Sequence, residues 1–204
     1  MEKAIVIIGA SGHGKVVADI AEKIGYKKII FLDDNTQLTS CGGYPIEGRV
    51  SEYRNYDGDM FVAIGNAEVR RDIQTKLINA GKNLAILIHP SAVIGENVVI
   101  GEGTVVMAGA VVNPGVTIGK GCIINTCASV DHDCVVENYV HISVGAHLAG
   151  NVHVGSGTWI GIGAVINNNT QITDNCMIGA GTVVIKDIME KGTYIGVPAK
   201  RLLG

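Results

Sequence analysis

The chain of 204 residues is long enough for two small domains, each with a buried core. Hydrophobic residues make up 47% of it, aromatic residues only 4%, and 28 residues are glycine, so we expect an interior of small aliphatic side chains with many tight turns. A formal net charge of -3 without a basic run gives no electrostatic reason to expect a nucleic acid or an anionic membrane as partner. The ligands should therefore be small molecules.

No run of about 18 apolar residues is present, which argues against a membrane span. The chain passes from Met1 directly into a strand-like segment, without the layout of a signal peptide. Five cysteines, an odd number with no C-x-x-C pair, fit a reducing compartment. We therefore expect a cytoplasmic protein without disulfides.

Strand-like and helix-like segments alternate in the first part of the chain. The expected elements are strands at 4–8, 29–32, 60–64 and 84–87, helices at 15–24 and about 67–80, and a glycine-rich turn at 9–14. Repetition of strand, helix and strand predicts a parallel sheet with helices packed on it. Residues 1–87 are therefore predicted to form a Rossmann-like α/β domain.

From Ile88 onward the pattern has a period of six residues. Ile, Val or Leu stands at every sixth position from Ile88 to Val184, seventeen hexads without an insertion, and a second, mostly smaller inward residue follows four places after each. Three hexads make one triangular coil of 18 residues, and successive coils stack at about 4.8 Å. Residues 88–204 are therefore predicted to form a parallel β-helix in which residues 18 apart are neighbours.

The corners of this β-helix are predicted from a second regularity. The third residue after each large aliphatic residue is Gly or Asn in twelve of the seventeen hexads, as a left-handed backbone at each corner requires. The unbroken hexads resemble those of the hexapeptide-repeat acyltransferases, and that resemblance implies a left-handed coil. Cys122, Cys134 and Cys176 occupy inward positions, so we interpret them as core residues.

The corner rule fails at the two ends of the repeat, at Ser91 and Asp187. It also fails at three consecutive hexads, where Cys127, Asp133 and Tyr139 stand in place of Gly or Asn. Local sequence rules tend to fail at functional sites. The segment around these three residues is therefore the predicted active site.

His132 is the candidate general base of this segment, because an imidazole titrates near neutrality and can take a proton from an attacking amine or hydroxyl. Asp133 can orient the ring and raise its basicity. The alternative, that His132 is only a solvated polar residue, is less favoured because of the neighbouring exceptions. Gly150 lies one coil away, and its amide is a candidate donor to the oxyanion of acetyl transfer, an interaction worth roughly 3 kcal/mol.

His141 is nine residues from His132, half a coil around the perimeter, so the two cannot readily meet within one chain. We therefore expect a homotrimer with active sites between the β-helices, in which His141 comes from the neighbouring subunit. His141, His147 and His153 are six residues apart and should occupy three different corners, which argues against a shared metal site. No metal is expected.

The segment Gly9–Gly14 follows a strand and opens a helix, where free backbone amides and the helix N-terminus bind phosphate. Its G-x-x-G-x-G spacing departs from the G-x-G-x-x-G dinucleotide fingerprint. Asp33 and Asp34 nevertheless end the second strand, where a ribose-binding acid would stand. The segment predicts a phosphate site, and NAD remains one possible ligand.

The whole chain resembles the family of sugar N- and O-acetyltransferases that includes the PglD enzymes of bacillosamine synthesis and the sialic acid O-acetyltransferases (NeuD). The resemblance is carried by Gly9–Gly14, Phe31–Asp34, Ala63–Asn66 with Arg70, His132–Asp133, His141–Ala146 and Gly196–Arg201. It implies transfer of an acetyl group from acetyl-CoA to the amino group of a UDP-linked 4-amino-4,6-dideoxy sugar in surface glycan biosynthesis.

By the same resemblance, the N-terminal domain holds the nucleotide-activated amino sugar and the β-helix binds acetyl-CoA. The implied substrate-binding residues are Ser11, Gly12, His13, Asp33, Asp34 and Gly65. His132 would be the base, with His141, Ile162 and Ala180 near the CoA arm. The bacillosamine enzymes carry Glu after the catalytic His, whereas this chain carries Asp133, a departure that bears on the choice of acceptor.

Two other functions stay open from the sequence. One is O-acetylation of a sialic acid or another sugar, which would make nucleotide contacts at Asp33 and Asp34 unnecessary. The other is a non-catalytic trimeric module that binds a nucleotide sugar or NAD. The register of His132, Asp133 and Gly150 favours an enzyme over such a module.

The C-terminal tail Gly196–Arg201 and Trp159 are expected to help close the end of the solenoid. Lys200 and Arg201 are also candidates to contact the phosphates of CoA. Capping alone is the simpler interpretation of the tail.

Overall fold

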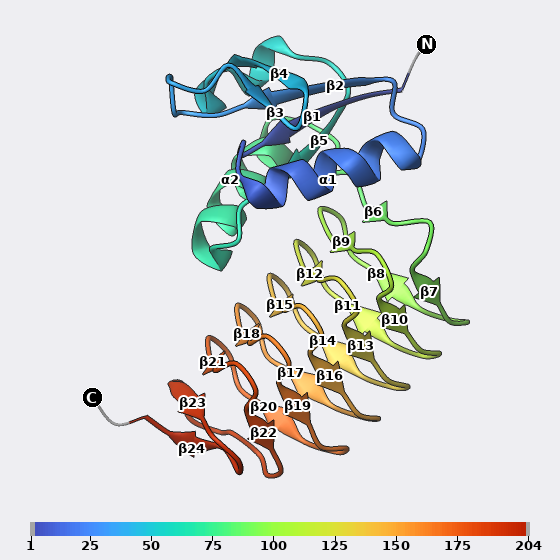
Figure 1. Cartoon of the computed structure of the whole chain (residues 1–204), viewed down its shortest axis with the longest axis vertical. Coiled ribbons are helices and arrows are strands. Elements are labelled where there is room, and N and C mark those ends of the chain that lie inside the picture. Colours follow the sequence, from blue (N-terminus) through green and yellow to red (C-terminus); the bar gives the residue numbers. More distant parts are fainter. Residues whose placement is uncertain (1–2, 203–204) are drawn as a thin grey trace. The chain divides into compact units, whose positions relative to one another are not determined.

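The computed structural model describes residues 3–202. The chain folds into two compact units, of which the first ends at Pro90 and the second begins at Ser91 (Figure 1). The first unit is an α/β fold and the second a stack of short parallel strands, as the sequence predicts. Within residues 3–202, no helix has both the length and the apolar character needed to cross a membrane.

A five-stranded sheet with two α-helices forms the N-terminal unit. Its elements are β1 (Ala4–Ile8), α1 (Gly12–Lys23), β2 (Lys28–Leu32), β3 (Ser40–Cys41), β4 (Tyr44–Gly48), the 3-10 helix η1 (Val50–Asn55), β5 (Asp59–Val62) and α2 (Ala67–Asn79), and the short strand β6 (Leu87–Ile88) follows outside the sheet. The strand order is β3-β4-β2-β1-β5, in which only the β3–β4 pair is antiparallel.

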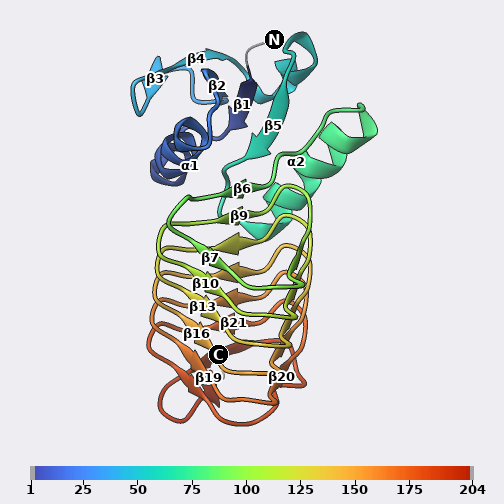
Figure 2. The same cartoon turned by 90° about the vertical axis from the view of Figure 1, so that its right-hand side faces the viewer.

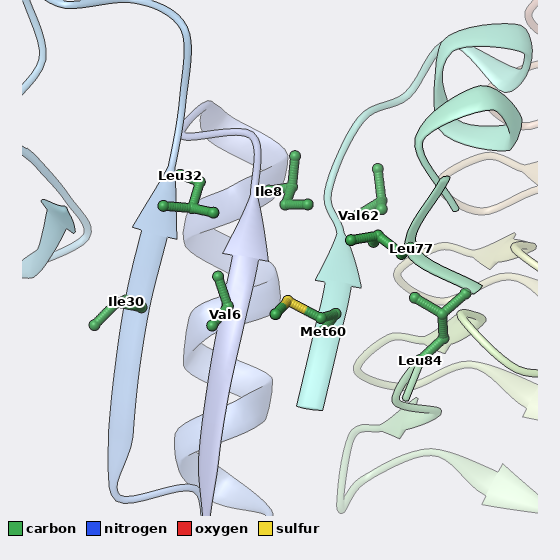
Figure 3. Close-up of a cluster of buried hydrophobic side chains, with 8 residues drawn as sticks. All are labelled: Val6, Ile8, Ile30, Leu32, Met60, Val62, Leu77 and Leu84. Atoms are coloured by element: carbon green, nitrogen blue, oxygen red, sulfur yellow. The ribbon is translucent and has the colours of Figure 1, made fainter. Parts of the chain in front are cut away.

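Alternation of side chains along the strands gives the sheet two apolar faces. One face carries a buried cluster that Leu77 of α2 completes (Figure 3). The members of this cluster are Val6, Ile8, Ile30, Leu32, Met60, Val62, Leu77 and Leu84. The ring of Phe31, on the opposite face, lies against α1, where a Cβ atom at Gly14 would come within 3.0 Å of it.

Three boundaries in this unit differ from those expected. Helix α1 begins at Gly12, three residues earlier than predicted. Gly14 therefore lies inside the helix and not in a turn. It allows the helix to pack closely on the preceding backbone, because a Cβ at Gly14 would overlap the carbonyl oxygen of Gly9. The 3-10 helix η1 was not expected. The strand expected at 84–87 is reduced to β6 and an isolated bridge between Met60 and Leu84.

The C-terminal unit is a parallel β-helix of two-residue strands (Figure 2). The strands are β7 (Val93–Ile94), β8 (Val99–Ile100), β9 (Val105–Val106), β10 (Val111–Val112), β11 (Thr117–Ile118), β12 (Ile123–Ile124), β13 (Ser129–Val130), β14 (Val135–Val136), β15 (His141–Ile142), β16 (His147–Leu148), β17 (His153–Val154), β18 (Trp159–Ile160), β19 (Val165–Ile166), β20 (Gln171–Ile172), β21 (Met177–Ile178) and β22 (Val183–Val184). A final hairpin consists of β23 (Thr193–Ile195) and β24 (Lys200–Arg201).

Three sheets form the faces of the coil. Face I runs β7-β10-β13-β16-β19-β22, face II runs β8-β11-β14-β17-β20, and face III includes β9-β12-β15-β18-β21-β23-β24. Within the coils each strand pairs in parallel with the strand 18 residues later, as in Val111 with Ser129. The predicted register of 18 residues is therefore present.

The interior of the β-helix follows the predicted pattern. Both inward positions of every hexad are buried from Thr104 to Val184. Cys122 and Cys176 are among these core residues, and each donates its backbone N–H to an inward threonine hydroxyl one coil earlier, that of Thr104 and Thr158 respectively. The hydroxyl oxygens of Thr104 and Thr158 are thus hydrogen-bonded inside the core, whereas that of Thr182 has no hydrogen-bond partner within residues 3–202.

Every corner residue from Asn97 to Gly181 has a left-handed backbone. The three exceptions to the Gly/Asn rule share it, with φ of 55° at Cys127, 60° at Asp133 and 61° at Tyr139. A side chain in this region costs roughly 1–2 kcal/mol. Cys127, Asp133 and Tyr139 are the three successive corners of one coil, so this coil carries a conformational cost that is lower at the other corners, where glycine or asparagine stands.

Exchange of glycine and non-glycine residues at one row of corners tests this cost. Cys127→Gly is expected to raise the free energy of unfolding by about 1 kcal/mol, because it relieves the left-handed strain. Gly145→Ala, one coil later with φ of 60° and no atom near the added Cβ, is expected to lower it by about 1 kcal/mol. Urea denaturation measures both, and unchanged stability in both variants would contradict the strain.

Candidate active site

His132 lies at the corner between faces I and II, in the coil whose corners lack glycine. Its Nδ1 is 2.8 Å from Asp133 Oδ2. Because a carboxylate only accepts, Nδ1–H donates in this pair and Nε2 keeps its lone pair. The side chain is 60% exposed, so the imidazole is open to a ligand.

Asp131 fixes the backbone of the same corner. Its Oδ1 accepts from the His132 backbone N–H at 2.8 Å and from Asn113 Nδ2 at 2.6 Å. These hydrogen bonds favour the ionised carboxylate and lower the pKa of Asp131. The hydrogen bond to Asp133, together with the charges of Asp131 and Asp133, raises the pKa of His132 above 6.5. The ring is therefore a stronger base than an isolated histidine.

Gly150 lies directly beside this imidazole, one coil further along. An ideal Cβ at Gly150 would be 2.5 Å from His132 Nε2, so only glycine lets the ring lie over this coil. The coils are held together here by Asn151 N–H, which donates to the His132 carbonyl at 2.9 Å. Among the backbone hydrogen bonds formed within residues 3–202, none has Gly150 N–H as donor. The amide is therefore available to an oxygen of a ligand.

His141 lies on face III and is only 8% exposed. Asn125 Nδ2 donates to its Nε2 at 3.1 Å, since an amide nitrogen cannot accept. The indole of Trp159, one coil later, packs on the ring with 4.3 Å between centroids. Within one chain His141 and His132 are thus on different sides of the coil, and the structure does not bring them together.

The other two histidines of the series lie on the remaining faces. His147 is on face I, where its Nδ1 is 2.8 Å from the Ser129 hydroxyl. His153 is on face II, where its Nε2 is 2.8 Å from Glu137 Oε1. The spacing of six therefore separates the three histidines, as predicted. They lie on strands, however, whereas we expected them at corners.

Ile162 and Ala180 lie at the corner between faces III and I, in one row with Val144. Hydrogen bonds stack this row: Gly163 N–H donates to the Val144 carbonyl at 3.0 Å and Gly181 N–H to the Ile162 carbonyl at 2.8 Å. Val144 is 43% exposed and Ile162 61%, and Ala180 is exposed as well. Val144, Ile162 and Ala180 form an exposed apolar row that can receive an aliphatic chain.

In the N-terminal unit, Ser11 and Gly12 mark the start of α1. Ser11 is the N-cap residue, with extended backbone and a side chain that makes no capping hydrogen bond, and the first turn contains no acidic residue. Free amides at a helix N-terminus attract anions. The turn before it is tight, since a Cβ at Gly9, which has φ of 106°, would be 2.9 Å from the Ala63 carbonyl oxygen.

Asp33 and Asp34 both bond to backbone amides. Asp33 Oδ2 accepts from Ala10 N–H at 2.6 Å and its Oδ1 from Asn35 N–H at 2.8 Å. Asp34 Oδ1 accepts from Val50 N–H at 3.1 Å, at the start of η1. The two acids therefore hold the glycine turn and the following loop in place. Beside Asp33 opens a cavity of 280 Å³, also lined by Asn35.

His13 lies near the buried Arg70 at the carboxyl end of β5. Arg70 Nη1 donates to the carbonyl oxygens of Ile64 and Gly65, at 2.8 Å each, which fixes the loop before α2. Burial, and then the charge of Arg70, lower the pKa of His13 to about 4, so its ring is neutral at physiological pH. His13 Nε2 is buried and has no hydrogen-bond partner within residues 3–202.

Three residues of the site had no role assigned from the sequence. Asn113 supports Asp131, Asn125 bonds to His141, and Val144 extends the apolar row. The register contains the signal for two of them, because Asn113 is 18 residues before Asp131 and Val144 is 18 before Ile162. Cys127, another of the three unusual corners, is exposed, and its thiol makes no hydrogen bond to residues 3–202.

Comparison with known proteins agrees with this architecture. Residues 4–77 match the PglD N-terminal domain, and residues 97–132 and 151–186 match the bacterial transferase hexapeptide family of six repeats. A curated relative, the UDP-N-acetylbacillosamine N-acetyltransferase of Bacillus subtilis (strain 168), is 36% identical over 101 residues. These are 47% of each protein, so the match spans about half the length of that relative.

Two solved structures are similar over nearly the whole chain. The acetyltransferase domain of PglB from Neisseria gonorrhoeae FA1090, in complex with acetyl coenzyme A, is 42% identical with a TM-score of 0.96, covering 99% of this chain and 100% of that one. A variant of the GDP-perosamine N-acetyltransferase from Caulobacter crescentus, in complex with CoA and GDP-perosamine, is 35% identical with a TM-score of 0.94, covering 98% and 97%.

These similarities confirm the predicted fold, including the left-handed sense of the hexapeptide coil. The aligned structures cover both units of this chain. The chain therefore belongs to the PglD-like family of hexapeptide-repeat sugar N-acetyltransferases.

Proposed function

We propose that the protein transfers the acetyl group of acetyl-CoA to the amino group of a nucleotide-linked 4-amino-4,6-dideoxy sugar, in cytoplasmic steps of surface glycan biosynthesis. The observation that carries this proposal is the His132–Asp133 pair stacked over Gly150, in a chain with end-to-end N-acetyltransferase relatives. The name of the Bacillus relative supports UDP as the nucleotide, and the Caulobacter complex makes GDP the second to test.

In the proposed reaction the amine nitrogen attacks the thioester carbonyl carbon and forms the C–N bond. His132 Nε2 accepts the proton that the amine loses, and Gly150 N–H donates to the oxyanion of the tetrahedral intermediate. Collapse of the intermediate breaks the C–S bond, and the imidazolium returns its proton to the CoA sulfur. The products are the N-acetyl sugar and free CoA, without a covalent enzyme intermediate.

Asp133 supports the base in two ways. Its carboxylate receives Nδ1–H, which selects the tautomer whose Nε2 is free, and its charge stabilises the imidazolium. An aspartate in left-handed conformation at the corner reaches the adjacent ring at 2.8 Å. The shorter carboxylate in place of the glutamate of the bacillosamine enzymes is thus compatible with general-base catalysis.

The N-terminal unit is proposed to bind the nucleotide sugar. The first-turn amides of α1, beginning with Gly12 after Ser11, suit the diphosphate, and the neutral His13 ring offers an uncharged hydrogen bond. Asp33 and Asp34 act chiefly by shaping the turn and loop around the ligand. Their remaining lone pairs can accept hydrogen bonds from hydroxyl groups of the ligand. Gly65 belongs to the loop that Arg70 fixes.

We propose that the β-helix binds the donor and assembles as a homotrimer. The apolar row of Val144, Ile162 and Ala180 suits the pantetheine arm. Faces I and II, on either side of the His132 corner, expose valines that a neighbouring subunit would cover; they include Val93 and Val99, each 59% exposed, and Val135, 41% exposed. We further propose that face III of one subunit packs beside the His132 corner of the next, so that His141, remote from His132 in its own chain, completes the site of a neighbour.

Loss of the base tests the function. His132→Ala is expected to lower kcat by about 10² to 10⁴, because proton removal by a positioned base contributes that much, and to leave the Kd of CoA nearly unchanged. Thiol release from acetyl-CoA is measured with UDP-, GDP- and dTDP-linked 4-amino sugars and with free sialic acid. His153→Ala on face II is the control. Full activity of His132→Ala, or preference for sialic acid, would contradict the proposal.

The pH profile tests the role of Asp133. Because the base acts only when deprotonated, kcat/KM falls as pH drops through the raised pKa of His132, which lies above 6.5. Asp133→Asn keeps an acceptor oxygen but removes the charge, so the acid limb should move to lower pH and the plateau should fall. The acceptor amine titrates in the same way in assays of the wild type and of the variant, so it does not account for a difference between their pH profiles. An identical acid limb in the variant would contradict the assignment.

Mixed trimers test whether sites are shared between subunits. His132→Ala and His141→Ala chains, each poorly active alone, are mixed by co-expression. If each site takes His132 and His141 from different subunits, random mixing restores about a quarter of the sites. If both residues act within one chain, every mixed trimer stays inactive. Recovered activity in purified mixed trimers, with their mass from sedimentation, distinguishes the two arrangements.

A further inference from the structure

Arg70 is a buried cation in the N-terminal unit. It lies in the first turn of α2, and its side chain is completely buried. Burial of a charge costs free energy, and a cation at the start of a helix also opposes the helix macrodipole. Both effects work against arginine as a simple space-filling residue at this position. Specific contacts of the guanidinium group therefore hold it there.

The guanidinium group holds the loop that joins β5 to α2. Its Nη1 donates to the carbonyl oxygens of Ile64 and Gly65, at 2.8 Å each. The next residue of the loop is fixed as well, because the Asn66 side-chain oxygen accepts the Val69 N–H at 3.0 Å and so caps α2. The path of the loop is thus determined by the first turn of α2.

This loop lies directly against the glycine turn that precedes α1. Strands β1 and β5 are parallel neighbours, with Ile8 opposite Val62, so the segments that follow them leave the sheet at the same edge. The two segments touch there, because a Cβ at Gly9 would be 2.9 Å from the Ala63 carbonyl oxygen and 3.0 Å from Ile64 Cγ1. A shift of the loop that the guanidinium group holds would therefore displace the turn as well.

Two glycines at this edge face open space. Neither Gly12, at the start of α1, nor Gly65 has a left-handed backbone, and a Cβ added at either would meet no other part of residues 3–202 within 4 Å. Backbone conformation and packing in this part of the chain thus do not require glycine at the two positions. Glycine also serves where the backbone approaches a ligand closely. The two glycines therefore indicate a ligand that lies across the turn and the loop.

The charges at this edge favour an anion as that ligand. The N-terminus of α1 carries the positive end of a helix dipole, and its first turn contains no acidic residue. The charge of Arg70 reaches the same turn, since burial and then this charge lower the pKa of His13. The carboxylate of Asp33 also lies here, where Ala10 N–H donates to it at 2.6 Å. The guanidinium charge offsets this negative charge for an anionic ligand.

We propose that Arg70 is a positioning residue of the acceptor site. Its two hydrogen bonds hold the loop so that Gly65 and the turn at Gly12 form one surface for the diphosphate of the nucleotide sugar, and its charge strengthens the binding of this anion. Because Arg70 is buried, it acts through the loop and through its electrostatic potential, without contact with the substrate. The inference rests on the proposed function, in which this unit binds a nucleotide sugar.

Arg70→Met fills similar space and removes the hydrogen bonds together with the charge. In calorimetric titrations and steady-state kinetics, we expect it to raise the Kd of UDP or GDP and the KM of the nucleotide amino sugar about thirtyfold, equal to about 2 kcal/mol. Because only acceptor binding is affected, kcat at saturating acceptor and the Kd of CoA should stay within twofold of the wild type. Arg71→Met removes an exposed charge at the next position of α2 and should match the wild type throughout.

Arg70→Lys separates the charge from the hydrogen-bonding geometry. An ammonium group keeps the charge but lacks the planar fork of donors, so the acceptor KM should rise about fivefold, less than in Arg70→Met. This variant decides the matter if urea unfolding shows that Arg70→Met does not fold. A wild-type acceptor KM in Arg70→Lys, or a fall in kcat in place of a rise in KM, would overturn the role of Arg70 while the proposed function stands. A wild-type protein that binds neither UDP nor GDP and acetylates no nucleotide amino sugar would instead remove the proposed function itself.

Discussion

The left-handed corner that recurs every six residues is the constraint on which the C-terminal unit depends. Because each corner ends a two-residue strand and starts the next, residue i stacks on residue i + 18 from Val93 to Val184. That register sets Gly150 beside His132, Asn113 beside Asp131 and Trp159 on His141. The candidate site is therefore assembled from strands and corners of rigid neighbouring coils, without a long loop.

The coil that contains His132 departs from glycine at all three of its corners, and the previous coil makes room for the side chains placed there. A Cβ at Gly115 would be 2.8 Å from Asp133 Oδ1, and one at Gly109 would be 3.1 Å from Cys127 Sγ. Strain in the backbone is commonly found at functional sites, where the surrounding structure supports it. For Asp133 the gain is visible, since the strained backbone aims its carboxylate at His132 Nδ1.

Periodicity predicted the β-helix well because a period of six has one structural meaning. The inward positions, the corners and the buried Cys122, Cys134 and Cys176 all follow from it. The N-terminal unit was less predictable in detail. Glycines there indicated a turn, but Gly14 lies inside α1, because the feature that selects it is its contact with the Gly9 carbonyl. Such contacts depend on packing and leave no periodic trace.

The acids Asp33 and Asp34 show a second limit of sequence reasoning. Their contact with a ribose stays a prediction, but nothing in the sequence indicated that both also bond to the backbone, at Ala10, Asn35 and Val50. Whether a carboxylate faces a ligand or an amide 23 residues away depends on how β1 and β2 align, which a single sequence does not state. The effect of Arg70 on the pKa of His13 also depends on packing, because His13 lies in α1 and Arg70 in α2.

The stacked rows also give the β-helix a fixed scale of length. Any two groups in one row are separated by a whole number of coil spacings of about 4.8 Å, and no smaller adjustment exists without breaking the hexads. A change in the distance between two groups of one row therefore requires the gain or loss of a complete coil of 18 residues. Solenoids of this kind therefore change in length by whole repeats, each of which contacts only its neighbours.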